Sequence, residues 1–263
     1  MPTELLAEQR DTTLVLTLSD PSTRNALSRE VYGRGADCLR QAAADAAVRS
    51  VVLCGAGDTF CAGGNLQRIL GVRAMGDVVG RPYQAESINL LKDLVLAITD
   101  CPKPVIAAVE GFAAGAGASL ALACDLLVAA EDAKLVMSYS RIGLSPDGGG
   151  SWQLARYLPR QLALKALWLA APLGAAELHA HGLVSQVSPK GRALEEALSM
   201  AAQLAKLAPN AVASVKKLAQ SALRDGLAQH LDSEREHFID NLFHVNGHEG
   251  PSAFLEKRSP QFR

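Results

Sequence analysis

Short apolar runs rich in β-branched residues alternate with longer segments of helical periodicity along the first 190 residues. This alternation is typical of α/β proteins with mainly parallel sheets, because parallel neighbours must be joined by a crossover that a helix usually supplies. Strands are predicted at 13–18, 50–54, 105–109, 126–129, 135–138 and 184–187. Helices are predicted at 28–47, 83–100, 115–123, 150–158, 161–171 and 175–181.

Beyond about residue 190 the strand pattern stops, and apolar residues recur at helical spacing. Pro209 can begin a helix there, and Asp225-Gly226 can end one. The sequence therefore predicts an α/β core over residues 1–190 and a helical region over residues 191–263. Because helices with several apolar stripes often pack against another subunit, we expect this second region to mediate oligomer formation.

Residues 111–130 form an apolar run as long as a membrane-spanning helix. Asp125 and three glycines interrupt it, so a helix and strand buried in a core are favoured. The 26 Lys and Arg residues balance 27 Asp and Glu, and charge therefore favours neither nucleic acid nor an anionic membrane as a partner. Five scattered cysteines, and an N-terminus without the apolar run of a secretory signal, predict a cytoplasmic protein.

Three glycine-rich segments, 55–65, 111–119 and 146–150, each follow a predicted strand. Glycine in such loops permits positive φ angles and lets the backbone approach a ligand closely. None ends in the Gly-Lys-Ser/Thr of a phosphate-binding loop, and the third glycine of the dinucleotide fingerprint is missing. Taken singly, the segments are equally consistent with tight turns. The histidines do not converge in the sequence, so no metal site is predicted.

Taken in order, the motifs are more specific. They are NAL at 25–27, FCAGGN at 60–65, PKPVIAAVEG at 102–111, GAG at 115–117, CD at 124–125, IGLSPDGG at 142–149 and AFLEKR at 253–258. Over nearly the whole chain this order resembles the crotonase (enoyl-coenzyme A hydratase/isomerase) family. Residues 113–117 and 146–147 look most like its branch of ring-epoxide phenylacetyl-coenzyme A isomerases of aerobic phenylacetate degradation.

The resemblance implies a fold and a substrate class. The fold is a spiral of ββα repeats forming two roughly perpendicular sheets, followed by helices that mediate assembly into a homotrimer or a hexamer, a dimer of trimers. The substrate is an acyl-coenzyme A thioester, and no metal or redox cofactor is implied. Two backbone N–H groups would stabilise the enolate formed when the α-proton leaves. The matching residues are Ala62 and Ala116.

The acid–base residues decide which reaction is expected. Hydratases of the family use two glutamates, whereas this sequence has Ser119 and Tyr139 at the matching positions. Asp147 stands where several isomerases of the family carry a catalytic aspartate. One carboxylate suffices for a 1,3-proton shift, because it can take a proton from one carbon and return it to another. We therefore expect an enoyl-coenzyme A isomerase; the alternative for Asp147 is an N-cap of the helix starting at 148–150.

The resemblance also implies contacts with coenzyme A, some of them from a neighbouring subunit through the C-terminal segment. The residues are Arg24, Ala26, Asn65, Leu66, Phe254 and Lys257. A solvated arginine is the alternative for Arg24, and an ordinary amphipathic helix is the alternative for Phe254 and Lys257. Asn65 departs from the aspartate usual in the family.

Several residues have only weaker signals. Cys61 is expected to be buried, and Ser119 to be a small polar residue without a nucleophilic role. Glu86 is a reserve candidate for a second acid, although a solvated helix position suits it better. Trp152 could line the acyl pocket or pack in the core. Three glycines within residues 70–81 predict a mobile segment there.

Other functions remain open from the sequence alone. An enoyl-coenzyme A hydratase would use Asp147 with an unidentified acid. A non-catalytic acyl-coenzyme A or RNA-binding homologue would account for the absence of both glutamates. A thioester hydrolase of the same fold would release free thiol.

Overall fold

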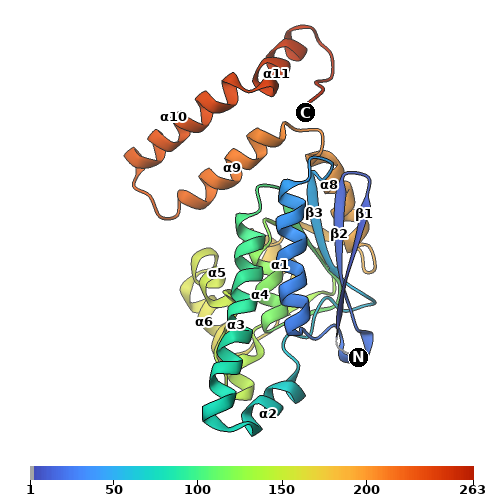
Figure 1. Cartoon of the computed structure of the whole chain (residues 1–263), viewed down its shortest axis with the longest axis vertical. Helices are drawn as coiled ribbons and strands as arrows, with labels where there is room; N and C mark the ends of the chain where they lie inside the picture. Colours follow the sequence, from blue (N-terminus) through green and yellow to red (C-terminus); the bar gives the residue numbers. More distant parts are fainter. Residues whose placement is uncertain (1–2) are drawn as a thin grey trace.

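The computed structural model describes residues 3–263 and contains two sheets (Figure 1). The larger sheet has the order β1-β2-β3-β4-β6-β9, and all its neighbours are parallel except β1 and β2. Its strands are β1 (Glu4–Arg10), β2 (Thr13–Ser19), β3 (Ser50–Gly55), β4 (Val105–Val109), β6 (Leu126–Ala130) and β9 (Gln186–Ser188). The smaller sheet has the order β5-β7-β8, with β5 (Phe112–Ala114), β7 (Lys134–Val136) and β8 (Leu173–Gly174).

The helices follow the strands in repeated units. They are α1 (Arg29–Ala44), α2 (Leu66–Ala74), α3 (Gly76–Asp100), α4 (Ala116–Ala123), α5 (Gly150–Tyr157), α6 (Arg160–Leu169) and α7 (Ala175–Ala180). In β4-β5-α4, and again in β6-β7-α5, the first strand joins the large sheet and the second joins the small one. The α/β class and the predicted ββα repeats are therefore confirmed.

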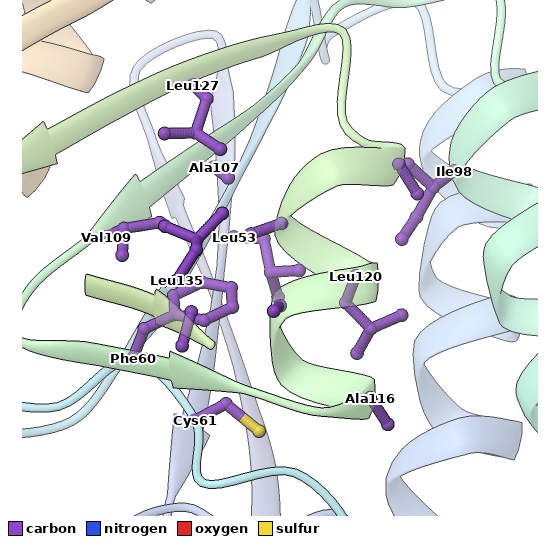
Figure 2. Packing of buried hydrophobic residues seen from close by; sticks show 14 of the residues in the cluster. Leu53, Phe60, Cys61, Ile98, Ala107, Val109, Ala116, Leu120, Leu127 and Leu135 are labelled. Carbon is purple, nitrogen blue, oxygen red and sulfur yellow. The ribbon is translucent and has the colours of Figure 1, made fainter. Parts of the chain in front are cut away.

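Helix α4 is enclosed by the core. Its Leu120 is fully buried. In Figure 2 the strands that carry Val109 and Leu127 lie on one side of α4, and Ile98 of α3 lies on the other side. Helix α8 (Ala193–Leu204) covers the other face of the large sheet through a second apolar cluster. Burial on both faces explains why the strand runs are continuously apolar rather than alternating.

Helices α9 (Pro209–Ser221), α10 (Leu227–Phe243) and α11 (Val245–Leu255) extend away from the sheets (Figure 1). Pro209 is the first residue of α9, as its position in the sequence suggested. Lys216 of α9 is tied to the core by an ion pair with Asp125, with Nζ and Oδ2 2.7 Å apart. Large apolar side chains of these helices are exposed, including Phe243 and Phe254.

The structure differs from the sequence predictions mainly in short or locally specified elements. The predicted strand at 135–138 ends at Val136, because a 3-10 helix, η2 (Ser138–Ile142), follows. Most of residues 70–81, predicted to be mobile, lie in α2 and α3. Asn65 caps α2 by accepting a hydrogen bond from the Arg68 amide at 3.1 Å. In the described chain, no helix is both long and apolar enough to cross a membrane.

Candidate functional site

The glycine-rich segment after β3 pairs with β5 in parallel and lies close to the start of α4. The Cys61 amide donates to the Phe112 carbonyl at 3.1 Å, and the Ala114 amide donates to the Cys61 carbonyl at 2.8 Å. Gly63 has a φ of +90°, and a Cβ there would lie 2.6 Å from the Ala114 oxygen. Only glycine therefore fits where this segment meets the N-terminus of α4.

The Ala62 amide, predicted to bind the substrate oxygen, is already used within the fold. It donates to the Arg24 carbonyl oxygen at 2.9 Å, so it is not free, and this prediction needs correction. Among residues 3–263, neither the Gly64 nor the Ala116 amide has an acceptor. Gly63, the residue before Gly64, lies against the start of α4, since a Cβ on it would be 3.4 Å from the Ala116 nitrogen.

The Gly64 amide could not have been identified from residue pattern alone. The φ of Gly63 interrupts the strand alternation that would otherwise give Ala62 and Gly64 the same orientation. The two free amides, Gly64 and Ala116, form a pair suited to a partial negative charge on oxygen. Ala116 is the first residue of α4, where unpaired amides and the helix dipole favour an anion.

Asp147 lies in the loop between η2 and α5 and is half-buried. The Tyr139 hydroxyl donates a hydrogen bond of 2.8 Å to its Oδ1 atom. Burial raises the pKa of Asp147, and the Tyr139 hydrogen bond partly offsets this. The N-cap of α5 is Gly149, with no side-chain capping bond, so the alternative that Asp147 caps this helix is not observed.

Ser119 of α4 packs against the loop that carries Asp147, close to the free amide of Ala116. A Cβ on Gly148 would lie 2.9 Å from the Ser119 Cβ, and one on Gly150 would lie 2.6 Å from its Oγ. Because Ser119 is three residues after Ala116, the loop carrying Asp147 packs within one helical turn of the Ala116 amide. Ser119 is fully buried and donates to the Gly115 carbonyl at 3.2 Å, which does not suit a nucleophile.

A cavity of about 270 Å³ adjoins the Gly64 segment. It contains two of the residues predicted to contact coenzyme A, Ala26 and Asn65. Its other lining residues are Thr3, Asp20, Leu27, Ser28, Glu30, Arg68 and Tyr83. Arg68 and Tyr83 were not anticipated, because nothing in the residue spacing brings α2 and α3 to this opening.

The other residues predicted to contact coenzyme A lie outside this cavity lining. Leu66 is exposed at the start of α2, and Arg24 is exposed with a φ of +56°. Phe254 and Lys257 belong to the C-terminal end of the chain, which Figure 1 places at the opposite end of the molecule from α2. Within one chain, Phe254 and Lys257 therefore do not line the cavity.

The weaker candidates separate clearly. Cys61 is fully buried, as predicted, and burial raises the pKa of its thiol to about 12. Glu86 forms an ion pair with Arg29 at 2.9 Å and is largely exposed, which suits a solvated residue better than an acid of the site. Trp152 is half-exposed beneath the Arg156 guanidinium. Within residues 3–263 no cluster of His, Cys, Asp and Glu has the arrangement of a metal site.

Two free amides beside a half-buried carboxylate are typical of enzymes that stabilise an oxyanion while moving a proton. Comparison with known proteins is more specific: the chain belongs to the enoyl-CoA hydratase/isomerase family, whose model matches residues 8–263.

Relatives in this family carry different activities. The chain is 37% identical over 250 residues to 1,2-epoxyphenylacetyl-CoA isomerase of Escherichia coli K12, covering 95% of this chain and 94% of that protein. It is 34% identical over 264 residues to 2,3-dehydroadipyl-CoA hydratase of the same organism, covering 99% and 98%. The crystal structure of an enoyl-CoA hydratase from Polaromonas sp. JS666 superposes with a TM-score of 0.95 at 52% identity, covering 98% and 99%.

Proposed function

We propose that this protein is an acyl-CoA isomerase that moves the double bond of an enoyl-CoA by a 1,3-proton shift. The observation that carries the proposal is the single carboxylate, Asp147, held by Tyr139 next to the free amide end of α4. Ser119 and Tyr139 occupy the positions where hydratases of the family have glutamates. Asp147 therefore acts without a second carboxylate from either position.

In the proposed mechanism the thioester oxygen accepts hydrogen bonds from the Gly64 and Ala116 amides. These bonds strengthen as negative charge develops on that oxygen, which makes the C2 and C4 protons more acidic. The Asp147 carboxylate takes one of these protons and returns it to the other carbon. Its raised pKa suits the task, because the same group must both accept and release the proton.

The remaining binding roles follow from the same proposal. Ala26 and Asn65 at the cavity contact coenzyme A, together with Arg24 and Leu66 beside it. Phe254 and Lys257 would reach the coenzyme A of a neighbouring subunit in a homotrimer or a dimer of trimers. The exposed apolar side chains of α10 and α11 support such an assembly. The proposed reaction needs no metal or redox cofactor.

The test is to incubate the protein with a 3-enoyl-CoA and with crotonyl-CoA. An isomerase produces the conjugated 2-enoyl absorbance from the first substrate and leaves that of the second largely unchanged. Loss of the crotonyl absorbance, with no isomerisation, would instead establish a hydratase.

Hydratase activity is the second candidate, because relatives with that name match almost the whole chain. Coenzyme A binding without exchange of the α-proton in deuterated buffer would support a non-catalytic binding protein and contradict both enzymatic proposals. Release of free thiol would indicate a thioester hydrolase.

Replacing Tyr139 with Phe should move the acidic limb of the kcat/KM profile to higher pH. The Tyr139 hydrogen bond stabilises the Asp147 carboxylate, so its removal raises the pKa of Asp147 further. Since only the ionised carboxylate can take the substrate proton, a higher pH is then required for activity. The pH–rate profile of isomerisation measures the shift, with Tyr157→Phe as control. An acidic limb that stays in place, or moves to lower pH, would contradict this role of Tyr139.

A further inference from the structure

Residues 24–27 hold the chain just before the free amide of Gly64. The Leu27 amide donates to the Gly63 carbonyl oxygen at 2.7 Å, and Leu27 pairs with Gly64 as an isolated parallel bridge. This contact lies on the edge of the segment opposite to β5, because the Cys61 amide and carbonyl already pair with β5 on the other edge. The peptide unit that joins Gly63 and Gly64 is thus held from the side that faces away from β5.

The planarity of this peptide unit connects the Leu27 contact with the site. In a trans peptide the carbonyl and the N–H of one unit point in opposite directions. Since the Gly63 carbonyl points to Leu27, the Gly64 N–H points away from Leu27, toward the side where β5 leads into α4. A Cβ on Gly63 would lie 3.4 Å from the Ala116 nitrogen, which agrees with this direction. The Leu27 hydrogen bond therefore sets the direction of one of the two proposed oxyanion donors.

Asn25 fixes the turn that presents the Leu27 amide. The residue is fully buried, and its backbone is left-handed, with a φ of +58°, a conformation that asparagine tolerates better than most residues. Its Oδ1 atom accepts from the Asp20 amide at 2.9 Å. Its Nδ2 atom donates to the carbonyls of Thr59 at 2.7 Å and Ala56 at 3.0 Å. The side chain therefore fastens this turn to the loop that follows β3.

These contacts require a carboxamide at position 25. One end of the side chain faces an N–H group and the other faces two carbonyl oxygens, so only a group with both an acceptor and a donor satisfies them. A carboxylate of nearly the same shape would turn an oxygen without a proton toward the Thr59 and Ala56 carbonyls, which leaves all three without a donor. Aspartate is therefore the substitution that removes the donor with the smallest change in size.

We propose that Asn25 is a positioning residue of the oxyanion site, which orients the Gly64 amide through the hydrogen bond between Leu27 and Gly63. The inference rests on the proposed function only in that a thioester oxygen binds at the Gly64 and Ala116 amides. If Asn25 instead stabilised the fold without directing the Gly64 N–H, its replacement would lower stability and leave the surroundings of the thioester oxygen unchanged.

Infrared spectroscopy of bound butyryl-CoA, isotope-labelled at the carbonyl carbon, separates these two roles. Hydrogen bonds to the carbonyl oxygen lower its stretching frequency, and butyryl-CoA has no double bond to be moved or hydrated. The wild type should lower the frequency relative to the free thioester. Asn25→Asp should lose about half of this lowering, because one of the two donors is misdirected while the Ala116 amide is retained.

Asn246→Asp is the matched control. Asn246 is 4% exposed, and its carboxamide makes the same kind of contacts. Its Oδ1 atom accepts from the Arg263 amide at 2.9 Å, and its Nδ2 atom donates to the Arg263 carbonyl at 2.8 Å. The residue belongs to α11, at the opposite end of the molecule from α2 (Figure 1). The control should lose stability and keep the wild-type carbonyl frequency.

Asn25→Gly is a second variant for the case in which Asn25→Asp does not fold, because glycine adopts the left-handed backbone without strain and lacks the side chain. A folded Asn25 variant with the wild-type frequency would overturn the inference, and so would an equal change in Asn246→Asp. Failure of both Asn25 variants to fold would also overturn it, since Asn25 would then serve the fold as a whole.

The wild type alone distinguishes failure of this inference from failure of the proposed function. If it does not lower the carbonyl frequency, the thioester oxygen does not bind at the amide pair and the role of Asn25 is lost. Turnover of a 3-enoyl-CoA is a separate readout. If the wild type lowers the frequency but does not isomerise, the proposed function fails while the role of Asn25 stands.

Discussion

Asp147→Asn is expected to lower kcat for conversion of a 3-enoyl-CoA to the conjugated isomer by about 10³-fold, within the usual range for loss of a general base. The carboxamide has nearly the shape of the carboxylate, but it cannot accept the substrate proton. The amide pair of Gly64 and Ala116 remains, so binding of the thioester should change little. Steady-state kinetics would therefore show a large fall in kcat and a small change in KM.

Stability separates this loss of chemistry from loss of structure. Burial raises the folded pKa of Asp147 above its unfolded value, so the folded state holds the proton more strongly. The contribution of this group to stability consequently declines as pH rises through the window between the unfolded and folded pKa values. Asp147→Asn removes that pH dependence and can still accept the Tyr139 hydrogen bond. Its Tm at neutral pH should equal or exceed that of the wild type.

Two outcomes would contradict the proposed role of Asp147. Undiminished turnover by a folded Asp147→Asn protein would remove this residue from the mechanism. A lower Tm at neutral pH would show that the carboxylate contributes to the fold, so that reduced activity could no longer be attributed to the missing base.

The strands of the large sheet were predictable because burial on both faces makes them short, continuous apolar runs. The run 105–109 coincides with β4, and 50–54 with all but the last residue of β3. Strands β5 and β8 have three and two residues, too few for a periodicity to be recognised. The exposed β1 depends on pairing with β2 rather than on apolar residues of its own.

The candidate site was predictable to the level of segments, but not of individual atoms. The order of the motifs indicated Asp147 and Ala116. These residues lie where the loop before α5 packs against the first turn of α4. The choice of Ala62 was wrong because a sequence does not reveal which amides the fold already uses.

The small residue at position 119 has a structural consequence for the choice of reaction. Gly148 and Gly150 pack directly against Ser119, at distances that leave little room for a longer side chain. A glutamate at this position would have to displace the loop that carries Asp147. The packing of α4 against the start of α5 therefore suits a short side chain at position 119, as the proposed mechanism with one carboxylate requires.

Gly63→Ala is expected to reduce kcat/KM for isomerisation by about 10²-fold or more, the usual cost of losing one oxyanion donor. An alanine at a φ of +90° is strained, and its Cβ would lie 2.6 Å from the Ala114 carbonyl oxygen and 3.4 Å from the Ala116 nitrogen. Relief of this overlap must separate the two segments, and with them the Gly64 and Ala116 amides. Turnover of a 3-enoyl-CoA and the Tm should both be measured.

Gly57→Ala is the matched control for this variant. Gly57 has a φ of +78°, comparable to that of Gly63, but a Cβ there would meet nothing within 4 Å. This substitution imposes a similar backbone strain, on the order of 1–2 kcal/mol, without moving the paired segments. The control should therefore lose some stability and keep its activity within about twofold, since the donor pair stays intact. If a folded Gly63→Ala protein were as active as Gly57→Ala, the two amides would not be the groups that stabilise the enolate.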